Sequence, residues 1–127
     1  MNPLELDLAP GAYSICRWPP GTSLPAWVYE GAFVSVTRTP TEVSSVCAAD
    51  AVPAGTVCEG PWRLFAVRGP LDFALTGVLA SLAVPLAAAA ISMFAVSTFD
   101  TDYMLVRAAD VERAAAALKK AGHRVFV

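Results

Sequence analysis

Two aspartates, Asp100 and Asp102, have the type and spacing best suited to chemistry with a small molecule. Carboxylates accept charge-assisted hydrogen bonds from an ammonium group. Alternate residues of a strand lie on one face, so the two carboxylates share a side unless a turn falls between them. Thr98 and Thr101 could add hydroxyl contacts. The alternative is that these acids only form a hairpin turn, where aspartate is common.

Other residues offer little for catalysis or metal binding. The chain has one histidine and three cysteines, with no Cys-x-x-Cys pair, no phosphate-binding loop and no Cys–His or Ser–His arrangement. The net charge of -2 comes without a long basic run, which disfavours nucleic-acid binding. We therefore expect no enzyme, no cofactor and no metal. The cysteines are expected to be small buried side chains, of which Cys47 and Cys58 could come close together.

The composition and the first residues indicate a folded cytosolic protein. Hydrophobic residues make up 56% of the chain and charged residues 16%, which is too apolar for disorder. The odd cysteine count and the lack of a basic-then-apolar leader at residues 1–8 argue against secretion. The expected location is the cytosol.

The segment from Phe73 to Phe99 contains no charged residue, and it allows two interpretations. One is a membrane span, which needs about 20 apolar residues. The other is a helix over 71–89, bent at Pro85, followed by a strand over 91–98. Bulky residues at helical spacing favour the second interpretation: Leu71, Leu75, Val78, Leu79, Leu82 and Leu86. The remaining faces are small, and no aromatic and basic anchors flank the segment as they flank membrane helices.

The remaining patterns complete an α+β domain. Strands are predicted over 62–67, 103–107 and 123–127, with a second helix from 108 to a stop at Gly122. The order is β-α-β-β-α-β, the ferredoxin-like arrangement, which implies an antiparallel sheet with the helices on one face. The first half is predicted to be a degenerate copy, because a shift of 60 places 36–42 on 96–102. We expect domains at 1–60 and 61–127, with an extra strand over 4–8.

Three segments resemble the ACT-domain family: GPLDFALTGVL at 69–79, PLA at 85–87 and STFDTDYMLV at 97–106. The nearest branch is that of small bacterial ACT proteins related to aspartate kinase regulatory domains and to eukaryotic cytosolic arginine sensors. The resemblance covers about residues 10–127. The sequence departs from the pattern at Ala88 and Ala90, where the family tends to have glutamate and glycine.

The resemblance implies two tandem ACT units, a homodimer, and a regulatory protein that holds an amino acid at the seam between units. It also implies a protein partner that the sequence does not identify. The family's ligand contacts come from the turn after the first strand and from the central strand with its corner. On this chain they fall on Asp72, Phe73, Ala74, Leu75, Gly77, Ser92, Met93, Thr98, Phe99, Asp100 and Asp102.

The chemistry of these positions agrees with an amino-acid ligand. The N-terminus of the predicted helix would offer backbone N–H groups to a carboxylate, and Gly77 would allow close approach. Asp100 and Asp102 would receive the ammonium. Asp72 could instead be the N-cap of the helix, and the small face around Gly77 could serve packing. Two other interpretations remain: an interaction module that has lost its ligand, and a single-span membrane protein.

Overall fold

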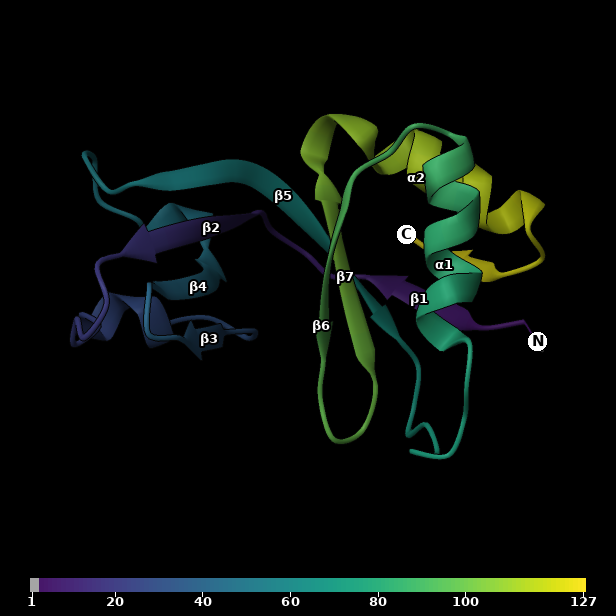
Figure 1. Cartoon of the computed structure of the whole chain (residues 1–127). Coiled ribbons are helices and arrows are strands. Elements are labelled where there is room, and N and C mark those ends of the chain that lie inside the picture. The colour runs from purple at the N-terminus through teal and green to yellow at the C-terminus, as the bar shows by residue number, and fades with distance from the viewer. Residues whose placement is uncertain (1–2) are drawn as a thin grey trace. The chain divides into compact units, whose positions relative to one another are not determined.

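The protein is described by a computed structural model, which places residues 3–127 (Figure 1). The chain forms strands and helices of the mixed α+β class that the sequence predicts. The strands are β1 (Glu5–Leu8), β2 (Tyr13–Trp18), β3 (Ser35–Arg38), β4 (Val43–Ala48), β5 (Cys58–Val67), β6 (Met93–Ser97), β7 (Asp102–Arg107) and β8 (Arg124–Phe126). The α-helices are α1 (Val78–Ala88) and α2 (Val111–Lys120). Short 3-10 turns are η1 (Ala26–Tyr29), η2 (Ala49–Ala51) and η3 (Ala108–Asp110).

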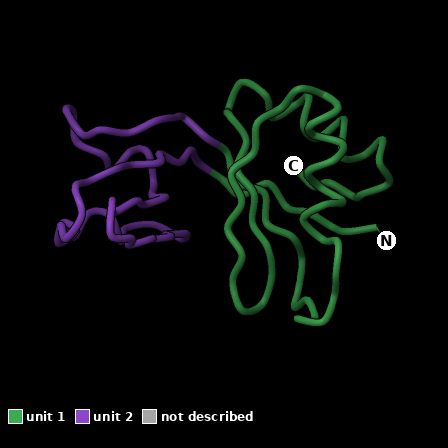
Figure 2. Tube along the Cα trace, viewed as in Figure 1, with its two compact units in different colours: residues 1–10, 63–127 green, residues 11–62 purple. Residues whose placement is uncertain are grey.

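The chain divides into two compact units (Figure 2). The C-terminal unit contains residues 3–10 and 63–127, and the N-terminal unit contains residues 11–62. Strand β5 passes from one unit into the other. The expected domain of residues 1–60 differs from the N-terminal unit mainly at its start, because β1 pairs with β5 and β8 in the other unit.

The C-terminal unit has the predicted order β5-α1-β6-β7-α2-β8 and is therefore ferredoxin-like. Its strands lie in the order β6-β7-β5-β1-β8. One pair departs from the antiparallel pattern. β1 lies between β5 and β8, antiparallel to the first and parallel to the second. The additional strand thus separates two strands of the β-α-β-β-α-β unit.

Both helices cover the same face of this sheet. Their buried side chains join those of the strands in one apolar cluster, whose largest members include Leu6, Phe65, Leu82, Leu86, Met104 and Leu118. On α2 the apolar stripe ends at Gly122, which takes the left-handed conformation with φ of 100°. That glycine is where the sequence places the helix stop.

Helix α1 begins at Val78, so the predicted start near Leu71 is wrong. Gly77 is the residue before the helix, and its φ of 77° interrupts the helical path. Upstream, the Asp72 carboxylate accepts a hydrogen bond from the Ala74 N–H at 2.8 Å and so closes a turn. Asp72 therefore does not cap the helix. The apolar spacing from Leu71 onward continues through a loop, which is why periodicity alone extends the helix too far.

Pro85 lies inside α1 and cannot donate a hydrogen bond to the carbonyl of Ser81. The buried His123 takes the place of that donor, with Nε2 at 3.0 Å from the Ser81 oxygen. Its Nδ1 accepts the Leu4 N–H, also at 3.0 Å. Because the carbonyl can only accept, the ring carries its proton on Nε2. His123 thus joins α1 to the start of the N-terminal strand.

The uncharged segment 73–99 becomes a loop, the eleven-residue helix α1 and strand β6. Among residues 3–127, no helix combines the length and apolarity needed to cross a membrane. A helix followed by a strand is the arrangement that the sequence favours over a span.

In the N-terminal unit the strands lie in the order β3-β4-β2-β5. The corner between β3 and β4 repeats the hydrogen bonds of the corner between β6 and β7. Thr39 N–H donates to Glu42 O at 2.9 Å, and Thr98 N–H donates to Thr101 O at 2.9 Å. In both corners the threonine hydroxyl also donates to that carbonyl. Thr39 thus matches Thr98, one residue away from the alignment by 60, and the internal duplication stays a prediction.

Candidate functional site

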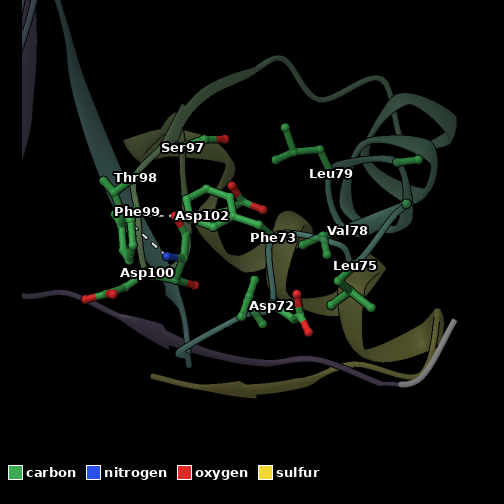
Figure 3. Close-up of a pocket in the computed structure, with 14 residues that line it drawn as sticks. Asp72, Phe73, Leu75, Val78, Leu79, Ser97, Thr98, Phe99, Asp100 and Asp102 are labelled. Atoms are coloured by element: carbon green, nitrogen blue, oxygen red, sulfur yellow. Dashed lines mark hydrogen bonds between the residues drawn. The ribbon is translucent and has the colours of Figure 1, made fainter.

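A cavity of about 440 Å³ opens in the C-terminal unit between the loop 71–77, the first turn of α1 and the β6–β7 corner (Figure 3). We call it the pocket. Its lining consists of Leu71, Asp72, Phe73, Leu75, Gly77, Val78, Leu79, Ala80, Ser97, Thr98, Phe99, Asp100, Thr101 and Asp102. The volume lies within the range of about 300 to 1,000 Å³ that is usual for small-molecule sites.

Backbone contacts hold the loop against the corner. Leu71 N–H donates to Asp100 O at 2.7 Å, and the Thr101 hydroxyl donates to Val67 O at 2.6 Å. Gly69 permits this approach, because a Cβ atom there would lie 3.0 Å from the Asp100 oxygen. The two walls are therefore linked by hydrogen bonds on the side where β5 ends.

The first turn of α1 presents backbone donors to the pocket. The first helical bond runs from Ser81 N–H to Gly77 O at 2.9 Å, so the N–H groups of residues 78–80 precede it. No side chain caps this end, since the preceding residue is glycine. A helix N-terminus of this kind carries partial positive charge and suits an anionic oxygen.

Carboxylates give the pocket an excess of negative charge. Asp72, Asp100 and Asp102 all line it, and no lysine, arginine or histidine belongs to the lining. Asp72 is partly engaged by the Ala74 N–H. Asp100 and Asp102 come from the corner, and in Figure 3 their side chains point in different directions, that of Asp100 away from Val78 and Leu79 and that of Asp102 toward the middle of the pocket. The lining thus includes both carboxylates and the first turn of α1.

Two aromatic rings, those of Phe73 and Phe99, meet at the pocket. Their centroids are 4.9 Å apart and their planes are inclined by 87°, an edge-to-face pair. Their exposed fractions are 73% and 79%, which is unusual for large apolar side chains outside a contact site. The rings join the loop to the corner and offer an apolar surface to whatever enters.

The structure brings most of the expected site residues together. Those lining the pocket are Asp72, Phe73, Leu75, Gly77, Thr98, Phe99, Asp100 and Asp102. Ala74 lies in the same loop but outside the lining. Ser92 and Met93 lie at the opposite end of β6 from the corner, and Met93 packs against the core instead. The ligand contacts themselves stay predictions.

Sequence reasoning missed part of the pocket wall. Val78, Leu79 and Ala80 line it because α1 begins seven residues later than predicted. The signal was Gly77, since glycine is the residue most able to adopt a positive φ before a helix. Conversely, the Thr98 and Thr101 hydroxyls donate to the carbonyls of residues 101 and 67. They hold the corner together.

Comparison with known proteins agrees with this fold. The ACT-domain family matches residues 57–120, and a second family, one of N-terminal domains, matches residues 11–55. The chain belongs to the ACT-domain family. No curated protein matches the sequence.

Several solved structures are similar. Protein Atu0741 from Agobacterium tumefaciens is 39% identical, with a TM-score of 0.94, and the match covers 99% of this chain and 94% of that one. VC0802 from Vibrio cholerae, described as a protein of unknown function and possible transport protein, is 21% identical. Its TM-score is 0.76, with 93% and 89% covered. The regulatory subunit of aspartate kinase from Thermus flavus is 12% identical. It has a TM-score of 0.64, with 94% and 97% covered. The last two show the fold alone.

Proposed function

We propose that the protein binds a free amino acid in the pocket and passes its presence to a partner as a regulatory signal, without catalysis. The observation that carries this proposal is the pairing of unlike groups around one cavity. The first turn of α1, residues 78–80, contributes backbone N–H groups to the lining, and the β6–β7 corner contributes Asp100 and Asp102. An α-amino acid carries one group suited to each.

The proposed pose places the ligand carboxylate at the N-terminus of α1, where the amides and the helix dipole stabilise an anion. The ammonium group then bonds to Asp100 and Asp102. The ligand side chain lies against Phe73 and Phe99. An amino acid has on the order of ten heavy atoms, so micromolar affinity, about -8 kcal/mol, requires about 0.8 kcal/mol per atom. This value is within reach of small ligands.

The negative charge of the lining restricts which amino acids can bind in the pocket. Three aspartates and one helix N-terminus line the pocket, so a ligand with a second carboxylate meets net repulsion. We therefore expect aspartate and glutamate to bind more weakly than neutral amino acids of similar size. The preference follows from the charges alone.

Regulation follows if binding favours one arrangement of the protein. A ligand at a hundredfold excess over its Kd stabilises the state that binds it by about 2.7 kcal/mol. We propose that the responsive assembly is a homodimer, with the ligand at the seam between ACT units, and that a further protein reads it. The Thermus flavus relative is by name a regulatory subunit, which supports this direction.

The test is a thermal-shift screen of the twenty amino acids. We expect at least one to raise the melting temperature, and Asp102→Asn to remove that shift. Asp50→Asn removes the charge of an exposed aspartate in η2 and is the control. This variant should keep the ligand-induced rise in melting temperature. If no amino acid stabilises the protein, the proposal fails and an interaction module without ligand becomes the better account.

A further inference from the structure

The three cysteines, far apart in the sequence, meet within the N-terminal unit. Cys16 lies on β2, between β4 and β5. On one side its sulfur is 3.9 Å from that of Cys47 on β4. On the other side Cys16 is the direct register partner of Cys58 on β5. Cys16 is therefore flanked by two thiols.

The pairing of Cys16 with Cys58 suits a disulfide. Arg17 N–H donates to Val57 O at 3.0 Å, so the neighbouring pair is hydrogen-bonded and the cysteines occupy a non-hydrogen-bonded position. In antiparallel sheets, Cα atoms at such positions lie about 4.5 Å apart and the side chains point to the same face. A disulfide accepts Cα separations of roughly 4.4 to 6.8 Å. The backbone therefore needs little movement to allow the bond.

The three thiols differ in access to solvent. Cys16 and Cys47 have exposed fractions of 0% and pack with Val28 of η1, whereas Cys58 is exposed. Burial first, and then the neighbouring thiols Cys47 and Cys58, together raise the pKa of Cys16 to about 12. A reagent in solution therefore meets Cys58 first, and Cys16 can react only with a sulfur brought to it.

We propose that Cys58 and Cys16 form a thiol oxidation site that a small-molecule disulfide converts into an intramolecular disulfide between β5 and β2. In the first step the Cys58 thiolate attacks the oxidant, forming a mixed disulfide and releasing one small thiolate. In the second step Cys16, losing its proton, attacks the Cys58 sulfur and releases the second small thiolate. Two protein thiols are oxidised and one small disulfide is reduced to two thiols.

Cys47 stays a thiol in this scheme. It is buried, and its cross-strand partner on β2 is Ser14. Its sulfur contacts are Cys16, the Ser45 hydroxyl and the Ser14 carbonyl, at 3.8 to 3.9 Å. Among the described residues no cluster of histidine, cysteine and acidic side chains could hold a metal ion, so thiol exchange is the chemistry we assign here.

The experiment treats the full-length reduced protein with oxidised glutathione, quenches it in acid, counts free thiols after unfolding and maps the bonds by peptide mass analysis. For the wild type we expect one of three thiols to remain, with Cys16 bonded to Cys58. The Cys47→Ser variant should form the same disulfide and leave no free thiol. Cys58→Ser should keep both of its thiols under conditions in which the wild type reacts fully.

Cys16→Ser separates the two steps, because Cys58 should then accumulate as a stable mixed disulfide. If that variant does not fold, peptide mapping of the wild type and of Cys47→Ser still decides the matter. A bond between Cys16 and Cys47, a persistent mixed disulfide in the wild type, or a disulfide-linked dimer would each overturn the proposal. The amino-acid pocket lies in the other unit, so failure here is distinguishable from failure of the proposed function.

Discussion

His123 and Ser81 are joined by a hydrogen bond that a proline makes necessary. The Nε2 atom of His123 lies 3.0 Å from the Ser81 carbonyl oxygen, whose helical donor is missing because Pro85 has no N–H. Buried carbonyl groups without a partner are costly, so the sequence supplies a donor from the far end of the chain. The same ring accepts the Leu4 N–H and so helps to fix β1 beside β8.

The first prediction concerns this pair. His123→Ala should lower the free energy of unfolding by about 2 kcal/mol, since it leaves two buried backbone groups without partners. In a Pro85→Ala background the N–H of the introduced alanine can serve the Ser81 carbonyl, so the same substitution should cost about 1 kcal/mol less. Urea denaturation of the four proteins measures this coupling. Additivity within about 0.3 kcal/mol would show that the two residues act independently.

The second prediction concerns the C-terminal ends of the two helices, where two substitutions should change the stability in opposite directions. Both helices close with the same backbone bonds: Ile91 N–H to Leu86 O at 2.9 Å, and His123 N–H to Leu118 O at 3.1 Å. The left-handed residue that follows α1 is Ala90, with φ of 57°, whereas the one that follows α2 is Gly122. The left-handed conformation costs an alanine about 1–2 kcal/mol. Replacement by glycine removes that cost, but part of the gain is lost because a glycine gives up more chain entropy on folding. Ala90→Gly should therefore stabilise by about 1 kcal/mol.

Gly122→Ala is the matched reverse substitution. No atom lies within 4 Å of a Cβ built there, so only backbone strain opposes the change. It should destabilise by about 1 kcal/mol in the same urea experiment. Equal signs for the two substitutions would contradict the assignment of the cap positions.

The third prediction concerns the wall of the pocket. Thr101→Val removes the hydroxyl that donates to Val67 O at 2.6 Å, whereas Thr101→Ser keeps it. We expect the valine variant to lose about 1 kcal/mol of stability and to bind any amino-acid ligand several-fold more weakly, because the corner loses its side-chain hydrogen bond to β5. The serine variant should bind like the wild type. Calorimetric titration compares the two, and equal affinity of the valine variant would count against this positioning role.

The fourth prediction is a dependence of stability on pH. The pKa of Cys16 is about 12 in the folded protein, against an ordinary value of 9.0, because the side chain is buried. Between these values the folded state holds a proton that the unfolded state has lost, so stability falls as the pH rises above about 9. The slope from this group is at most about 1.4 kcal/mol per pH unit.

The control for this dependence is Cys16→Ser, measured under reducing conditions. Other groups, including Tyr13, whose pKa burial also raises, contribute equally to both proteins. The difference between the two unfolding curves therefore isolates Cys16. It should be constant below about pH 8 and shrink above about pH 9. A constant difference up to about pH 11 would mean that the thiol is not the titrating group.

Much of the C-terminal unit could be predicted because its apolar periodicity is strong and its stop signals are standard, as at Gly122. The start of α1 could not, since Leu71 and Leu75 continue the helical spacing into a loop that is closed by a carboxylate turn. Its end was predicted within one residue, at 89 against the observed Ala88, although alanine rarely adopts the left-handed conformation of Ala90.

Long-range pairing explains the remaining differences. A short alternating strand such as β1 shows which face is buried but does not show its partners, so its place between β5 and β8 was not predictable. The contact of Cys16 with both other cysteines likewise depends on register. At the pocket, the expected contact at Met93 instead faces the core because β6 alternates toward it.

The most direct test of the central claim is a titration of isotope-labelled protein with the amino acid that stabilises it most, followed through its backbone amide resonances. If the ligand binds in the pocket, the largest shifts fall on residues 78–80 and 98–102. They should vanish when the ligand is replaced by its analogue without the amino group, or by its amide without the carboxylate. Binding that persists with both analogues, or shifts confined to residues 11–62, would contradict it.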